Sequence, residues 1–181
     1  MGVGKIVRRT FLVGSAAVAG GVAFGYYYVT RPVKNPLLEG LGEGEAAITP
    51  FVKITPDGIT LITPRADSGQ GVYSMQAYLI AEELDIDPKN ATLDPGEPHQ
   101  AYYNSVLLQA AVPYPEYQHS WLIDTMRSMM ETPAKLLSMQ MTGGSTTVPD
   151  MHERLRKAGA VARETLKLAA SKRTGVPVAK L

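Results

Sequence analysis

Two glycine-rich turns, each directly ahead of an amphipathic helix pattern, constrain this chain more than any other feature. The first turn is Ser68-Gly69-Gln70-Gly71 ahead of residues 72–84, and the second is Thr142-Gly143-Gly144-Ser145-Thr146 ahead of residues 148–170. The start of a helix leaves backbone N–H groups unpaired and carries the positive end of the helix dipole, so glycines there let an anionic group approach the backbone. Two such turns in one small domain predict a cofactor with phosphate or other electron-rich edges, if the fold brings the turns together.

The composition narrows the class of protein. At 181 residues, 45% of them hydrophobic, the chain supports one modest globular core once its N-terminus is set aside. Its 18 Lys and Arg residues against 17 Asp and Glu give a formal charge of +1, and no basic face with interleaved aromatic residues is present. Nucleic-acid binding is therefore not predicted.

The chain contains no cysteine. It can therefore make no disulfide, ligate no iron–sulfur cluster and offer no thiol nucleophile. A redox centre, if there is one, must come from a cofactor or from another chain. The three histidines, at positions 99, 119 and 152, lack ligand spacing, so we predict no metal-ligating residue.

The N-terminus has the order of an export signal, with basic residues first and an apolar run after them. Lys5, Arg8 and Arg9 precede the apolar stretch 11–29. The pair Arg8-Arg9, followed by Thr10 and two apolar residues, resembles a twin-arginine signal, whose route carries folded proteins. We therefore expect residues 1–30 to be a signal, and the protein to be periplasmic.

A plain membrane anchor remains the alternative for residues 1–30. The apolar stretch is about as long as the ~20 residues that one bilayer crossing needs. No clear Ala-x-Ala cleavage site follows it, and Tyr26-Tyr27-Tyr28 stands there instead, a composition that favours the membrane–water boundary. Cleavage and retention as an inner-membrane anchor both stay open.

The remainder reads as a linker over residues 31–47 and one domain over 48–181. Two β-rich runs, 51–54 and 59–63, flank a Pro-Asp-Gly turn and predict a hairpin. A further short strand is expected at 91–94, and helices at 72–84, 121–141 and 148–170. We predict an α+β fold, a small mixed sheet with helices packed on one face.

Three finer expectations concern helix packing. The apolar stripe of the 121–141 helix is interpreted as core filling; it consists of Trp121, Leu122, Met126, Met129 and Met130. Ala158-Gly159-Ala160 is expected to permit close approach to the sheet. The buried stripe of the last helix should consist of Leu155, Ala158, Ala162, Leu166 and Ala169.

The order of these segments resembles the large molybdopterin-binding subunit of the xanthine dehydrogenase family, of the isoquinoline 1-oxidoreductase beta-subunit or aldehyde dehydrogenase type. The resemblance covers residues 46 to 178. The motifs that carry it are Arg8-Arg9-Thr10-Phe11-Leu12, 59–63, Gly69-Gln70-Gly71-Val72-Tyr73, Ala81-Glu82-Glu83-Leu84, Tyr103-Asn104, Thr142-Gly143-Gly144-Ser145-Thr146 and 155–163. Any one of them is common, but the set in this order is fairly specific.

The resemblance implies that residues 48–181 are part of a molybdopterin-binding domain. The residues that it implies bind the cofactor are Gly69, Gln70, Gly71, Gly143, Gly144, Ser145 and Thr146. Gln70 would hydrogen-bond to the polar edge of a molybdenum cofactor, in dinucleotide form, and the N–H groups of residues 143–146 would receive its oxygens.

The family's chemistry and partners follow from the same resemblance. Family enzymes hydroxylate aldehydes or N-heteroaromatic rings with oxygen taken from water. Their electrons leave through iron–sulfur clusters on a small partner subunit, which would explain why this chain has no cysteine. The implied partners are that subunit, the rest of the large subunit, a small-molecule substrate and the twin-arginine export machinery.

Departures from the family pattern decide what the chain can do alone. Its later Gly-Gly-x-Phe-Gly loop and its C-terminal glutamate base are absent, so the chain reads as truncated, has no predicted catalytic residue and is expected to be inactive by itself. Asp67, beside the first turn, is expected to cap the backbone that follows it. His152 is not interpreted as catalytic.

A different class remains open: a membrane-anchored periplasmic binding or structural module whose glycine turns are ordinary helix starts. A cofactor cradle requires Gln70 and Gly144 to face one cleft, and such a module does not. A P-loop or Rossmann enzyme fails on spacing, because Gly69-Gln70-Gly71 has no third glycine at the expected step and no Gly-Lys-Ser/Thr follows.

Overall fold

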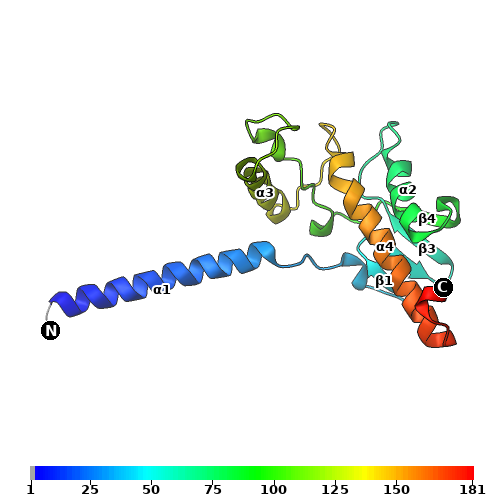
Figure 1. Cartoon of the computed structure of the whole chain (residues 1–181), viewed down its shortest axis with the longest axis horizontal. Helices are drawn as coiled ribbons and strands as arrows, with labels where there is room; N and C mark the ends of the chain where they lie inside the picture. The colour runs from blue at the N-terminus through cyan, green and yellow to red at the C-terminus, as the bar shows by residue number, and fades with distance from the viewer. Residues whose placement is uncertain (1–2) are drawn as a thin grey trace. The chain divides into compact units, whose positions relative to one another are not determined.

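The computed structural model describes the backbone of residues 3–181 and the side chains from residue 15 onward. The chain divides into two compact units, Met1–Val33 and Lys34–Leu181 (Figure 1). The first unit holds the single helix α1 (Val3–Thr30). The second holds the remaining elements and both glycine-rich turns.

The structure gives no support to a membrane anchor in residues 1–30, the alternative left open by the sequence. Among the residues that the structure describes, no helix is long and apolar enough to cross a membrane. The Arg8-Arg9 motif lies outside the residues whose side chains are described.

A four-stranded mixed sheet forms the base of the second unit. Its strands are β1 (Ala46–Thr49), β2 (Val52–Thr55), β3 (Gly58–Ile62) and β4 (Ala91–Asp94), which lie in that order. The β2–β3 hairpin is antiparallel, as predicted, and β4 runs parallel to β3. A parallel pair needs a long crossover connection, and here α2 (Val72–Leu84) supplies it.

Strand β1 was not expected, because its residues fall at the junction of the expected linker and domain. The strand has four residues and pairs antiparallel with β2, with a register irregularity between Ala47 and Thr49. Only Ile48 and Thr49 in it are β-branched, so its own sequence carries a weak strand signal. Pairing with the neighbouring hairpin therefore defines this strand.

Two helices cover one face of the sheet, which confirms the expected α+β arrangement. Helices α2 and α4 (Thr147–Thr174) pack along one another, and both contact the sheet (Figure 1). The core lies between these layers and contains Val52, Leu61, Ile80 and Leu155, all fully buried. Burial of such side chains is the main stabilising contribution available to a domain of this size.

The expected buried stripe of α4 is right only for its first half. Leu155, Ala158 and Ala162 are buried, but Leu166 is 37% exposed and Ala169 is exposed as well. Helix α4 continues to Thr174, beyond the predicted end at 170, and its last turns leave the elements that cover its first half (Figure 1).

The apolar stripe of helix α3 (Trp121–Leu136) is exposed at Trp121, Leu122 and Met129, so the interpretation as core filling was wrong for these three residues, whereas Met126 and Met130 are half-buried. Trp121 is 83% exposed and Met129 is 64% exposed. The buried residues of the helix are Ile123 and Ala134, and Arg127 donates to the carbonyls of Pro115 and Gln118 in the preceding loop at 2.8 and 3.0 Å. The helix ends at residue 136 rather than at the expected residue 141.

Replacing Met129 by glutamate should therefore leave the stability nearly unchanged, within about 0.5 kcal/mol, because the side chain is in water already. Ile123, on the buried face of the same helix, is the matched control, and Ile123→Ala should cost about 2 kcal/mol or more. Urea unfolding of both variants tests this. A loss for Met129→Glu as large as that of the control would mean that the stripe is packed after all.

Candidate functional site

The two glycine-rich turns line one cleft of about 820 Å³. From the first turn and its flank come Ala66, Ser68, Gln70 and Gly71, from the second come Thr142, Gly143 and Ser145, and the helix starts behind them add Val72, Met75, Thr147 and Val148. Four of the seven sequence-predicted residues therefore line the cleft: Gln70, Gly71, Gly143 and Ser145. Gly69, Gly144 and Thr146 belong to the same turns and do not line it.

The segments that carry the two turns touch directly. The N–H of Ala66 donates to the hydroxyl oxygen of Thr142 at 2.9 Å, across 76 residues of sequence. The condition that the sequence left open, that the fold brings the turns together, is therefore met. Thr142, Gly143 and Ser145 are the residues of the second turn that line the cleft. Gly144 does not line it, so of the pair that a cradle was expected to bring to one cleft, only Gln70 lines it.

The first turn is closed by its own aspartate. The carboxylate of Asp67 accepts the N–H groups of Gly69 at 2.7 Å, Gly71 at 3.4 Å and Tyr73 at 2.8 Å. The bonds from Tyr73 and Gly69 hold the pKa of Asp67 below its usual range. The capping role expected for Asp67 is confirmed, so the start of α2 already carries a negative charge of its own.

Gln70 is likewise engaged within the first turn. Its Oε1 accepts the N–H and the hydroxyl of Ser68 at 2.6 and 3.0 Å, and its Nε2 donates to the carbonyl of Ala66 at 3.2 Å. The side chain lines the cleft, but its polar atoms point back into the loop. A ligand that hydrogen-bonds to Gln70 must therefore replace these contacts.

The second turn leaves the start of α4 more open. Gly144 and Ser145 have φ angles of 58° and 57°, a left-handed conformation that glycine adopts freely and serine adopts at a cost. Thr146 provides no side-chain cap to α4. The N–H groups of Thr147 and Val148 stand in the first turn of the helix, where no helical carbonyl can receive them. They are the amides best placed for an anionic ligand, because both residues line the cleft.

Thr146 uses its own N–H differently from the implied cofactor contact. That N–H donates to the carbonyl of Gly143 at 3.2 Å, and the N–H of Asp150 donates to the carbonyl of Thr146 at 3.0 Å. Its role in the turn is therefore internal.

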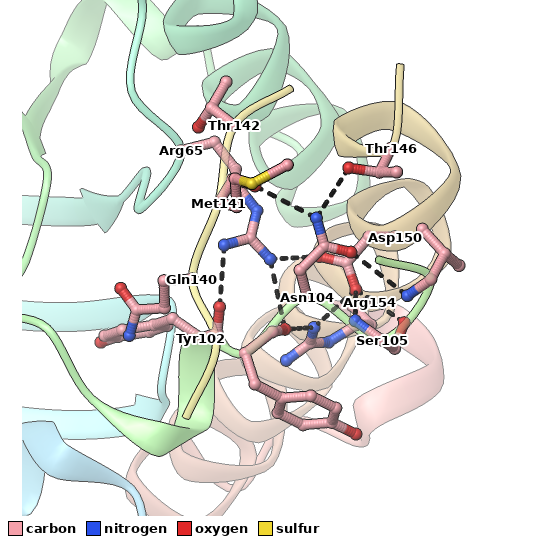
Figure 2. A network of polar contacts seen from close by, with 12 residues as sticks. Arg65, Tyr102, Asn104, Ser105, Gln140, Met141, Thr142, Thr146, Asp150 and Arg154 are labelled. Carbon is pink, nitrogen blue, oxygen red and sulfur yellow. Dashed lines mark hydrogen bonds and ion pairs between the residues drawn. The ribbon is translucent and has the colours of Figure 1, made fainter. Parts of the chain in front are cut away.

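A buried ionic network joins the residue just ahead of the first turn to the start of α4, just after the second turn (Figure 2). The side chains of Arg65 and Asp150 form an ion pair at 1% and 0% exposure. Arg65 also donates to the carbonyls of Tyr102 at 2.9 Å and Tyr103 at 3.2 Å. Burial lowers the pKa of the Arg65 guanidinium, and the bond to Asp150 opposes that shift.

The network joins elements that are far apart in sequence. Asp150 also accepts the N–H and hydroxyl of Ser105 at 2.8 and 2.7 Å and a guanidinium N–H of Arg154 at 3.0 Å. The backbone of Arg65 pairs twice with the buried amide of Gln76 on α2, at 3.1 Å each. Arg65 thus links the first turn, α2, residues 102–105 and α4.

The sequence analysis did not single out Arg65, Gln76 or Ser105. No local pattern marks them, because Arg65 and its partner Asp150 are 85 residues apart. Asp150 was noticed only as an acidic residue near a helix start. Within the described residues, no group of three His, Asp or Glu side chains is arranged to hold a metal ion.

Comparison with known proteins gives one relative. No protein-family profile and no solved structure matches this chain. The chain is 26% identical over 180 residues to the isoquinoline 1-oxidoreductase subunit beta of Brevundimonas diminuta. The match covers 98% of this chain but only 19% of that protein. The chain is therefore similar to about a fifth of a much longer oxidoreductase subunit.

Proposed function

We propose that this chain supplies part of the cradle for a molybdenum cofactor in the large subunit of an exported hydroxylase. The single observation that carries the proposal is the cleft, which both glycine-rich turns line and where Ala66, just ahead of the first turn, donates to Thr142 of the second. The similarity to a protein named as an oxidoreductase beta subunit also supports this proposal.

The cleft suits such a cofactor in size and chemistry. Its volume of about 820 Å³ lies in the range of ligand-binding pockets. None of the residues that line it is charged. The amides of Thr147 and Val148 would receive anionic oxygens, and the hydroxyls of Ser68 and Ser145 would serve a heterocycle's polar edge. Val72 and Val148 offer apolar contacts to its faces.

When bound, this cofactor supplies the redox chemistry by which aldehydes or N-heteroaromatic rings gain an oxygen atom from water. The chain's own residues bind and orient it, and no residue here is assigned as the base. The base, the substrate pocket and the electron-transfer clusters would come from the rest of the large subunit and from a small iron–sulfur subunit. The export signal at Arg8-Arg9 would deliver the assembled protein to the periplasm.

One observation favours the second candidate, a periplasmic module without cofactor. Asp67 and Gln70 satisfy the polar groups of the first turn without any ligand. An ordinary helix start has this arrangement too. The two candidates differ in what they require of the second turn, because only a cradle needs the amides of α4 to stay accessible.

The deciding experiment measures molybdenum and pterin in the purified full chain, co-expressed with the product encoded immediately downstream. We expect both to co-purify with the wild-type chain. Ser145→Asp places a carboxylate beside the α4 amides and should lower the pterin content about tenfold through repulsion, with no loss of stability, since Asp tolerates a left-handed backbone. Ser128→Asp, on the exposed face of α3, is the matched control and should retain pterin. Pterin absent from the wild type, or equal in both variants, would contradict the proposal.

A further inference from the structure

The second glycine-rich turn forms one wall of the cleft, called here the second wall, and the first turn forms the other, the first wall. Two consecutive hydrogen bonds, called here the relay, hold the second wall on the side away from the cleft. The Nδ2 of Asn104 donates to the hydroxyl of Thr146 at 2.8 Å, and that hydroxyl donates to the carbonyl of Gly143 at 2.7 Å. Asn104 is fully buried. Neither Asn104 nor Thr146 lines the cleft. Both side chains act on the side of the turn that faces the protein (Figure 2).

Asn104 binds both ends of the second turn. Its Nδ2 also donates to the carbonyl of Met141 at 3.1 Å, and its backbone N–H donates to the carbonyl of Met139 at 2.8 Å. The turn between Met141 and Thr146 is thus fastened at its start and at its end by one side chain. A buried amide with its hydrogens used in this way fixes a loop more firmly than an exposed contact does.

The turn needs such a restraint. Ser145 is a non-glycine residue in the left-handed region, and such a conformation persists when the surrounding contacts determine it. The relay supplies these contacts, because it ties the residues on either side of Gly144 and Ser145 to each other. The first wall is held by the same segment: Arg65, which precedes it, donates to the carbonyl of Tyr103, next to Asn104.

We propose that Asn104 and Thr146 are positioning residues that set the second wall of the cleft, with Thr146 acting through its hydroxyl and not as a cofactor contact. Residues 102–105 then fix both walls, one through Arg65 and the other through Asn104. The spacing of the cleft is a property of this segment. The consequence for ligand affinity rests on the proposed function, whereas the positioning of the turn does not.

Substitution of Thr146 in the full chain tests the relay. Thr146→Val keeps the shape and removes the hydroxyl, and Thr146→Ser keeps the hydroxyl. The amides of Thr146 and Asn104 donate to the carbonyls of Gly143 and Met139, so their hydrogen exchange reports opening of the turn. It should be about tenfold faster in the valine variant, because local opening becomes easier. Exchange should return to near the wild-type rate in the serine variant. The Gly69 and Gly71 amides should not change.

Thr165→Val is the matched control, because the Thr165 hydroxyl donates to the carbonyl of Val161 on the exposed side of α4. It should leave exchange in the turn unchanged. Unchanged exchange in Thr146→Val, or failure of Thr146→Ser to restore it, would overturn the relay. A change spread evenly over the whole domain would overturn it too, since that outcome means general destabilisation.

The affinity for molybdopterin gives a second readout. The apparent dissociation constant should rise about tenfold in Thr146→Val and stay within about threefold in Thr146→Ser. If hydrogen exchange changes as expected in the variants but the wild-type chain binds no pterin, the proposed function is wrong and the positioning role of Thr146 is still supported. Equal affinity in all variants, with the turn loosened, would show that the relay does not set the binding geometry.

Discussion

Gly159→Ala is expected to destabilise the domain by about 3 kcal/mol, although alanine is the better helix former by about 1 kcal/mol. A Cβ at position 159 would lie 2.2 Å from the carbonyl oxygen of Ile80 and 3.1 Å from the Cβ of Glu83. The nearest obstacle is backbone, which cannot rotate away as a side chain can. Helices α2 and α4 would have to separate, and their contact is the largest in the domain.

The test compares two substitutions of neighbouring residues on one helix. Ala160→Gly, at the next position, should cost only the helix propensity, about 1 kcal/mol. Urea unfolding of both variants, with circular dichroism as the probe, gives the two free energies. A stabilised Gly159→Ala variant would mean that the helices are farther apart than described. A loss equal to that of Ala160→Gly would mean that they separate at little cost.

Gly159 also shows which features of helix packing can be predicted from the sequence and which cannot. The small residues at 158–160 correctly predict a close approach, but the partner is helix α2 and not the sheet. A stripe of small residues reports that something lies near, and the identity of the neighbour depends on the tertiary fold. The stripe of α3 makes the same point: apolar periodicity predicted the helix, but the buried face, at Ile123 and Ala134, depends on the tertiary fold.

Short sequence patterns were sufficient to predict the elements whose contacts lie close together in the sequence. The Pro-Asp-Gly turn predicted the β2–β3 hairpin, and the glycine turn predicted the start of α2 at Val72. The seven candidate residues form two turns for the same reason. That the turns share a cleft was left open, because the contacts that join them, Ala66 to Thr142 and Arg65 to Asp150, link residues 76 and 85 positions apart.

The second large effect is expected at the buried ion pair. Removing its carboxylate with Asp150→Ala should cost about 3–5 kcal/mol, because the Arg65 charge remains buried without its counter-ion. Ser105 loses the acceptor for its N–H and its hydroxyl at the same time. Arg154, whose side chain is 26% exposed and which bonds to the carbonyls of Ala101 and Tyr103, can stay in place.

Asp124→Ala is the matched control, since the carboxylate of Asp124 is 50% exposed where it pairs with His119 and Arg127, and its loss should cost less than about 1 kcal/mol. Urea unfolding measures both losses. An Asp150→Ala variant no less stable than this control would mean that water reaches Arg65 and screens its charge.

A double substitution separates the ion pair from its packing. Arg65→Met combined with Asp150→Ala should be more stable than Asp150→Ala alone, because no charge is left buried without a partner. The Nε of Arg65 makes no hydrogen bond within the described part of the chain, so the arginine carries a desolvation cost even in the wild type. We expect the double variant to fold but to bind pterin poorly, because Arg65 also anchors residues 102–105, which hold both walls of the cleft. Full pterin binding in that variant would show that packing alone positions the turns.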